Sequence, residues 1–145
     1  MIAYLDTSAL VPLLIDEPAS PLCARVWDDA DDVVSVRIAY VEAAAAIAQA
    51  RRTGRLTRSQ QRDAVTLLDD TWQQLQLVEV DDPLVHRAGT LADLHNLRGY
   101  DAVHCAGAES INDAEVVAAS GDRQLLAAWG SLGMSTLDVN DSQRG

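Results

Sequence analysis

Lysine is missing from this sequence altogether, and its 11 basic residues are all arginine. Mechanisms that need a catalytic or phosphate-binding lysine, including that of a Walker A loop, are therefore excluded. Cysteine is scarce as well. Cys23 and Cys105 are too few for a disulfide framework and have no metal-ligand spacing. Both lie among apolar residues, so we predict that they are buried free thiols.

Positive charge and long apolar runs are also in short supply. The net charge is -11, from 22 acidic residues against 11 basic ones. This balance argues against a nucleic-acid partner unless cations enter an acidic site and the few basic residues are grouped. No window approaches the roughly 18 uninterrupted apolar residues of a membrane span, and no basic signal-peptide flank opens the chain. We therefore expect a cytoplasmic protein with no membrane partner.

What the sequence does contain is a globular composition. Apolar residues make up 48% of its 145 residues, enough for one domain with its own core. Strands are expected at 2–5, 33–36, 77–80, 116–119 and 136–139. Helical stretches are expected at roughly 8–15, 19–30, 38–53, 57–75, 82–96, 101–110 and 122–131. This alternation predicts a single α/β domain over 1–139, with a central, mainly parallel sheet of about four to five strands, and a short tail over 140–145.

Turn and cap residues agree with this division of the chain. Gly54 is expected to separate two helices, and Thr57 is expected to cap the second of them together with a following glutamine. Asp81 and Asp82 are expected caps of the next helix.

Four of the acidic residues stand out by position. Asp6 ends the first strand, Glu42 lies in an otherwise apolar and alanine-rich helix, and Asp101 and Asp122 open later helices. Each has a plainer explanation: a helix cap for the three aspartates, and a partly exposed side chain for Glu42. Together they indicate more, because the carboxyl ends of parallel strands meet at one edge of a sheet, where ligands bind.

Carboxylates crowded at one edge repel one another, and a divalent cation relieves that repulsion. Mg²⁺ and Mn²⁺ prefer oxygen ligands, whereas no cluster of cysteine and histidine competes for zinc. His104 lies one turn after Asp101, and we expect it to be packed inside or to support the acids rather than to bind a metal.

Several segments resemble a known family in their order and spacing. The segments "YLDTSALV", "DEPAS", "VEAAAAI", "LRGYDAVHCAGA" and "SGDRQLL" are similar to those of PIN-domain ribonucleases, especially the VapC toxins of bacterial toxin–antitoxin pairs. The resemblance covers residues 2–139. It implies a single PIN-like α/β/α domain acting as an endoribonuclease on structured or single-stranded RNA, with transfer RNA and ribosomal RNA as the expected substrates.

The resemblance also assigns roles to individual residues. The residues that it implies as catalytic and as ligands of Mg²⁺ or Mn²⁺ are Asp6, Glu42, Asp101 and Asp122. It places supporting hydroxyls at Ser8 and Ser120. It implies a VapB-like antitoxin and a homodimer, for which Trp27 and Trp72 offer apolar contacts if they are not part of the core.

Two surface features complete the expectations. Five arginines fall between positions 51 and 62, and we predict that Arg51, Arg52 and Arg55 bind RNA phosphates; the alternative is a solvated basic turn. The antitoxin is expected to place an arginine among the four acids. Its apolar side chains are expected in a groove between the early helices, near Leu10, Leu13, Leu14 and Val41.

Other classes fit less well. A receiver domain and a haloacid-dehalogenase-like phosphatase both need a lysine that this chain lacks. The remaining alternative is a catalytically silent PIN-like module that only binds a protein partner. Retention of all four acids argues against that alternative.

Overall fold

A sheet of five parallel strands forms the centre of the structure, a computed structural model in which residues 1–141 are described. The spatial order of the strands is β3-β2-β1-β4-β5. Their bounds are β1 Ile2–Leu5, β2 Asp32–Val36, β3 Gln76–Val78, β4 Val116–Ser120 and β5 Ser135–Asp138. The predicted α/β class with a parallel sheet is confirmed.

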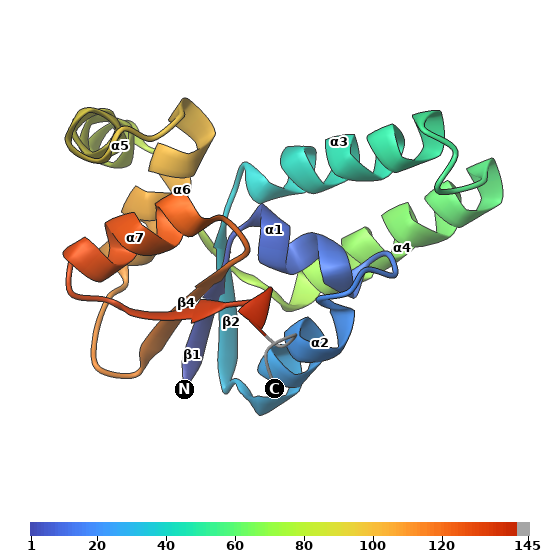
Figure 1. Ribbon diagram of the computed structural model, residues 1–145, viewed down its shortest axis with the longest axis horizontal. Helices are drawn as coiled ribbons and strands as arrows, with labels where there is room; N and C mark the ends of the chain where they lie inside the picture. The colour runs from blue at the N-terminus through green and yellow to red at the C-terminus, as the bar shows by residue number, and fades with distance from the viewer. Residues whose placement is uncertain (142–145) are drawn as a thin grey trace.

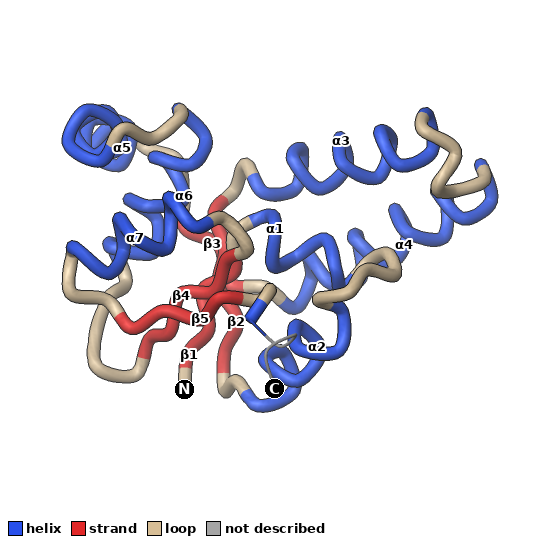
Figure 2. The backbone as a smooth tube through the Cα atoms, in the orientation of Figure 1, coloured by secondary structure: helices blue, strands red, loops and turns tan. Residues whose placement is uncertain are grey.

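Helices cover both faces of this sheet (Figures 1 and 2). One group has α1 Thr7–Leu10, the 3-10 turn η1 Val11–Leu13, α2 Ser20–Asp29, α3 Ala39–Arg52 and α4 Arg58–Gln74. The other group has α5 Asp82–His95, α6 Gly99–Ser110 and α7 Arg123–Ser131. Each group packs on its own hydrophobic core, so the sheet lies between two helical layers.

The strand order produces a switch in chain direction between β1 and β4. From β1 the chain moves through β2 to β3 with the first group of helices, and it then returns to β4 and β5 with the second group. Because crossovers between parallel strands are right-handed, the two directions place their helices on opposite faces. A crevice is expected at the carboxyl ends of β1 and β4, where the direction changes.

Alternation along β1 connects the two cores. Ala3 and Leu5 belong to the core beneath α1–α4, whereas Tyr4 belongs to the core beneath α5–α7, since successive strand side chains point to opposite faces. The Tyr4 ring packs edge-on against the buried Trp129 at a centroid distance of 5.9 Å. β1 is therefore buried on both faces, as its short apolar run predicts.

Several predicted boundaries were wrong. The third strand covers Gln76–Val78 instead of 77–80, because the backbone pairing ends where Arg37 donates to the Val78 carbonyl. The helix predicted over 8–15 ends at Leu10 and continues as a 3-10 turn that contains Pro12, since proline has no N–H for an α-helical bond.

The cap predictions were mostly confirmed. Thr57 and Gln60 form a reciprocal capping box, and Gly54 turns the chain between α3 and α4 with a φ of 83°. Asp81 caps α5, but Asp82 is the first residue of that helix and not its cap.

Other predictions concern the thiols and the tail. Cys23 and Cys105 are free and buried, and burial raises their pKa values to about 11 and about 12. At the start of the predicted tail, Asn140 Nδ2 donates to the Gly121 carbonyl at 3.1 Å. Residues 142–145 of the tail lie outside the described part of the chain. Within residues 1–141, no helix combines the length and apolar character that crossing a membrane requires.

Candidate active site

Asp6 lies at the end of β1 with a carboxylate held from both sides. Only 4% of the residue is exposed. Ser8 Oγ and the Ala9 amide donate to Oδ1 at 2.7 and 3.0 Å, and Ser120 Oγ donates to Oδ2 at 2.6 Å. Burial has the largest influence on the pKa of Asp6 and raises it, while His104 and the serine hydrogen bonds act in the opposite direction. Asp6 also caps α1, so it fills the cap role as well.

The two serines join the ends of β1 and β4. Their hydroxyl oxygens lie 3.3 Å apart. Ser8 Oγ accepts from the Gly121 amide at 2.7 Å, and Ser120 Oγ accepts from the Asp122 amide at 2.9 Å. Parallel pairing of Leu5 with Ala119 sets this register. The hydroxyls thus fix Asp6 relative to the segment that carries Asp122.

Glu42 reaches the same edge from the first turn of α3. Its Oε1 accepts from Thr7 Oγ1 at 2.9 Å and lies 2.8 Å from His104 Nε2. Nδ1 of His104 lies 2.9 Å from the hydroxyl of the buried Tyr4. Burial opposes ionisation of Glu42, but the hydrogen bonds from His104 and Thr7 outweigh it, so the pKa of Glu42 is lowered. His104 is 2% exposed, in agreement with the prediction that it packs inside beside the acids.

Asp101 and Asp122 complete the cluster in different ways. Asp101 lies in the first turn of α6, whose cap position is Arg98, so a cap role for Asp101 was wrong. Burial raises the pKa of Asp101 most, and the charges of Asp122, Asp6 and Glu42 raise it further. Asp122 caps α7, where its Oδ1 accepts from the Gln124 amide at 2.8 Å. The structure therefore brings all four acids into one electrostatic environment.

Sequence reasoning missed two residues that support this cluster. Thr7 donates to Glu42, and Tyr4 meets the far side of the His104 ring. Thr7 was visible as a hydroxyl between Asp6 and Ser8. Tyr4 was visible as the residue of β1 that carries a hydrogen-bonding group within an apolar run, because a buried tyrosine hydroxyl usually has a partner.

The donor set fits a small divalent cation better than a closed metal cage. Within residues 1–141, no three side chains of His, Cys, Asp or Glu converge closely enough to hold a metal ion as they stand. Mg²⁺ usually takes only one or two protein carboxylates and completes its shell with water and substrate phosphate. The neighbouring carboxylates repel the negative charge of Asp101 and so raise its pKa, and a cation bound between them would relieve this repulsion. We conclude that the oxygen-only cluster fits Mg²⁺ or Mn²⁺.

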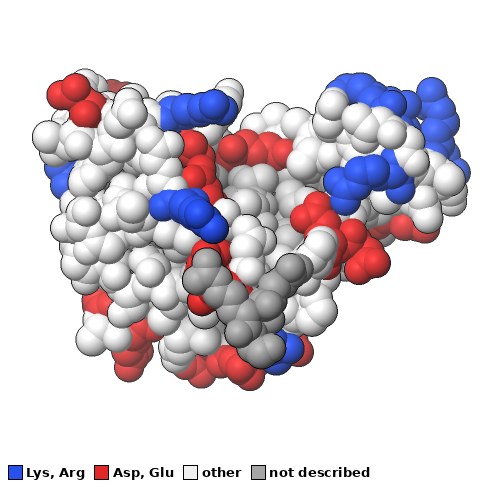
Figure 3. Space-filling model, viewed as in Figure 1, with Lys and Arg blue, Asp and Glu red and all other residues white. Residues whose placement is uncertain are grey.

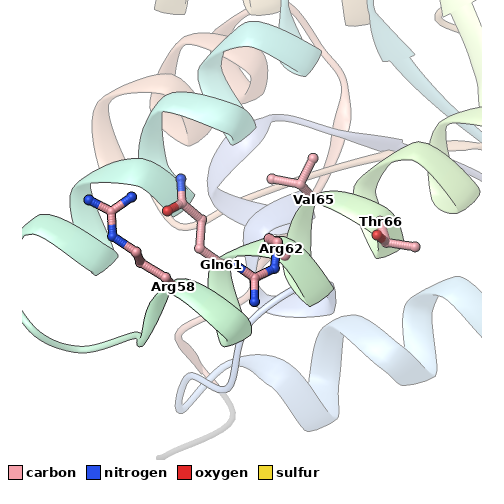
Figure 4. A pocket seen from close by; sticks show the side chains of 5 residues that line it. All are labelled: Arg58, Gln61, Arg62, Val65 and Thr66. Carbon is pink, nitrogen blue, oxygen red and sulfur yellow. The ribbon is translucent and has the colours of Figure 1, made fainter.

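The grouped arginines lie elsewhere, at the α3–α4 turn. Figure 3 shows basic side chains at the far end of this hairpin, away from the hollow with acidic side chains. Arg55 lies 3.6 Å from Glu17, whereas the buried Nε of Arg51 has no hydrogen-bond partner among the described residues. Figure 4 shows Arg58, Gln61 and Arg62 beside an open pocket on α4, which Val65 and Thr66 also line.

The four residues expected near an antitoxin groove between the early helices differ in exposure. Leu10 and Leu14 are buried in the core between the sheet and α1–α4, since the first turns after β1 fold inward. Leu13 is partly buried against the same core. Val41 is 60% exposed and is therefore available to a partner. Of the four predicted residues, two are excluded as contact surface.

A family model described as PIN domain matches residues 3–128. This range spans both halves of the sheet and all four acids. The chain belongs to the PIN-domain family.

A curated relative narrows this assignment, and solved structures share the fold. The chain is 42% identical to Ribonuclease VapC45 of Mycobacterium tuberculosis over 124 residues, which cover 86% of each protein. The crystal structure of M. tuberculosis VapC20, a sarcin-ricin loop cleaving toxin, matches 87% of this chain and 94% of that one, with a TM-score of 0.67 and 17% identity. The structure of VapBC-1 from nontypeable Haemophilus influenzae matches over 97% of this chain and 99% of that one, with a TM-score of 0.65 and 14% identity. Within the PIN-domain family, the chain is a member of the VapC group.

Proposed function

We propose that this chain is the toxin of a toxin–antitoxin pair and that it cleaves RNA as an endoribonuclease dependent on Mg²⁺ or Mn²⁺. The observation that carries the proposal is the gathering of Asp6, Glu42, Asp101 and Asp122 at the carboxyl edge of β1 and β4. The 42% identity to Ribonuclease VapC45 supports the reaction class.

The four acids have different tasks in this proposal. Together they would hold a divalent cation, which would lower the pKa of a bound water and stabilise negative charge on the phosphodiester. Asp6 presents a carboxylate fixed by hydrogen bonds from Ser8 and Ser120. Glu42 is kept ionised by Thr7 and His104.

The remaining task is to remove a proton from the attacking water. The described residues give the Asp101 carboxylate no hydrogen bond, in contrast to the carboxylates of Asp6, Glu42 and Asp122. A carboxylate whose oxygens are not held by the protein is the best suited of the four to orient a water and take its proton. We assign this task to Asp101.

The decisive experiment is Asp6→Asn. Asparagine keeps the shape and the cap of α1 but removes the charge, so RNA cleavage should fall at least roughly 100-fold, as when one electrostatic group of an active site is lost. Because burial already opposes the charge of Asp6, the fold should persist, which thermal unfolding measures.

The matched control is Asp93→Asn on an exposed position of α5. It should cleave RNA like the unsubstituted protein. Full activity of Asp6→Asn would falsify the assignment and leave the silent protein-binding module as the explanation. We expect Asp101→Asn and Asp122→Asn to match Asp6→Asn, and Glu42→Gln to lose less.

Likeness to VapC20 supports a proposal for the substrate. VapC20 cleaves the sarcin-ricin loop, and we propose a structured or single-stranded region of ribosomal or transfer RNA as the target of this chain. Mapping new 5′ ends after incubation with total RNA, with Asp6→Asn as the blank, identifies which of the two is cut.

We also propose a VapB-like antitoxin and a homodimer. Likeness to the VapBC-1 structure supports the antitoxin. Trp27 and Trp72 are both partly buried against the core, so each offers a partner only part of its ring. The exposed Val41 on α3 is a further apolar contact.

A further inference from the structure

Two exposed arginines lie within three residues of the acids in the sequence. Arg98 occupies the cap position of α6, three residues before Asp101, and Arg123 is the first residue of α7, immediately after Asp122. Figure 3 shows basic side chains on the rim of the acidic hollow, apart from those at the tip of the α3–α4 hairpin. The site therefore has a basic rim that is separate from the hairpin arginines.

A tertiary contact holds the two rim segments together. Gln124 Nε2 donates to the Asn96 carbonyl at 2.8 Å, which joins the start of α7 to the turn before α6. Asn96 takes the left-handed conformation with a φ of 53°, and Leu97 is buried beneath it. Arg98 and Arg123 each lie within two residues of this contact, so they share one anchored edge.

Both rim arginines are free of acidic partners among the described residues. The arginine ion pairs there involve Arg37, Arg55 and Arg87. Arginines without a carboxylate partner are suited to binding phosphate.

Tyr100 adds an exposed ring between Arg98 and Asp101. It is 64% exposed, whereas the other tyrosines and the tryptophans, all within the described residues, are buried or partly buried. An exposed aromatic ring close in sequence to arginines suits single-stranded nucleic acid, because bases stack on such rings while guanidinium groups hold phosphates.

We propose that Arg98, Tyr100 and Arg123 form a binding site for single-stranded RNA on the rim of the acidic cluster. The arginines hold phosphates next to the cleaved bond, and Tyr100 stacks on an adjacent base. Positive charge at this point also offsets the repulsion between the acids and the substrate backbone. The site deepens the proposed function and rests on it.

The test of the arginines is RNA binding in the Asp6→Asn background, where the substrate stays intact. A fluorescent single-stranded RNA is titrated by anisotropy over a series of salt concentrations. Arg98→Gln combined with Arg123→Gln should weaken binding and reduce the slope of log affinity against log salt by about 1.4, since each single-strand phosphate contact contributes about 0.7. Arg25→Gln on α2, another exposed arginine, should change the slope little.

The test of Tyr100 separates stacking from charge. Tyr100→Ala should weaken binding about tenfold without changing the salt slope, the effect of losing one stacked base. Tyr100→Phe keeps the ring and should bind like the unsubstituted side chain. A probe with abasic positions should remove the difference between tyrosine and alanine.

Outcomes for the rim and for the nuclease are distinguishable. If Asp6→Asn abolishes cleavage but the rim variants bind RNA with unchanged affinity and slope, the rim proposal is overturned and the proposed function stands. If the rim variants lose affinity for the antitoxin and not for RNA, the rim is a protein contact and the proposal is likewise overturned. If Asp6→Asn still cleaves RNA, the proposed function itself fails.

Discussion

The buried residue Tyr4 contacts both the core beneath α5–α7 and the histidine that supports Glu42. Its ring separates Trp129 from His104, and its hydroxyl meets His104 Nδ1 at 2.9 Å. The opposite ring nitrogen of His104 meets Glu42. The position of a candidate catalytic carboxylate therefore depends on a side chain in the opposite core, through contacts that are all buried or partly buried.

Gly107 provides the space that Tyr4 needs. A Cβ at this position would lie 2.9 Å from the Tyr4 hydroxyl and 3.4 Å from its ring. Gly107→Ala should therefore lower the free energy of unfolding by about 1 to 3 kcal/mol, the usual cost of overpacking a core. Urea unfolding measures the change.

A second helix glycine supplies the comparison. Gly89 in α5 has no atom within 4 Å of the Cβ position. Gly89→Ala should raise the free energy of unfolding by up to about 1 kcal/mol, because alanine is the better helix former. If Gly107→Ala stabilises the protein as Gly89→Ala does, Tyr4 has room to move and the tight packing is refuted.

At the scale of elements, the length of α3 separates the arginines at the tip of the α3–α4 hairpin from the acids. α3 carries Glu42 in its first turn and Arg51 and Arg52 in its last. At about 1.5 Å per residue, the helix places these ends roughly 15 Å apart. RNA held at the hairpin tip would thus extend well beyond the cleaved bond.

The prediction for the hairpin concerns salt. Replacement of Arg51, Arg52 and Arg55 by glutamine should weaken RNA binding and reduce its salt slope by up to about 2, if each holds one phosphate. Part of the charge of Arg55 is already met by Glu17 at 3.6 Å, so we expect Arg55→Gln to contribute least.

One result of this salt titration would contradict RNA binding by the hairpin arginines. An unchanged slope would show that the hairpin arginines serve only as solvated charge. Because the rim arginines are tested separately, substitutions in both regions should have additive effects on the logarithm of affinity if the RNA spans both.

At the scale of the whole molecule, charge is distributed unevenly. The chain carries a net charge of -11, yet its arginines gather at the hairpin tip and on the rim of the acidic hollow (Figure 3). A basic partner would be attracted to the acidic remainder of the surface during encounter. The four carboxylates together offer such a partner a concentration of negative charge.

The antitoxin prediction follows from that site. Expressed together with its neighbouring gene, the chain should co-purify with a small protein that blocks RNA cleavage through an arginine placed among the acids. Raising MgCl₂ should weaken inhibition more than NaCl of equal ionic strength, since the cation and the arginine compete for the same carboxylates. Changing that arginine to alanine should have a similar effect.

Two results would contradict this regulation. One is the absence of any small partner after purification from the native host. The other is inhibition that responds equally to the two salts, which would place the partner away from the acids. Neither result bears on cleavage by the isolated chain.

The sequence alone determined the order of strands and helices and the candidate acids. Apolar runs of strand length, helix caps such as Thr57 and the turn at Gly54 are local, because periodicity and backbone preferences act within a few residues. Asp6 could be singled out since a carboxylate at the end of a buried strand needs a reason. These features were predictable without knowledge of which helices and strands pack against one another.

Only the tertiary structure decided which groups meet. The contacts of Glu42 with His104 and of Tyr4 with His104 join residues 62 and 100 positions apart, and no local pattern encodes such pairs. The burial of Leu10 and Leu14, which removed them from the expected groove, depended on how the first turns after β1 fold against the sheet. Likewise, the hydrogen bond from Gln124 to the Asn96 carbonyl joins the segments that carry Arg98 and Arg123, which are 25 positions apart in the sequence. Packing between elements that are distant in the sequence sets these positions. Local sequence patterns do not encode such packing, so only the folded structure reveals it.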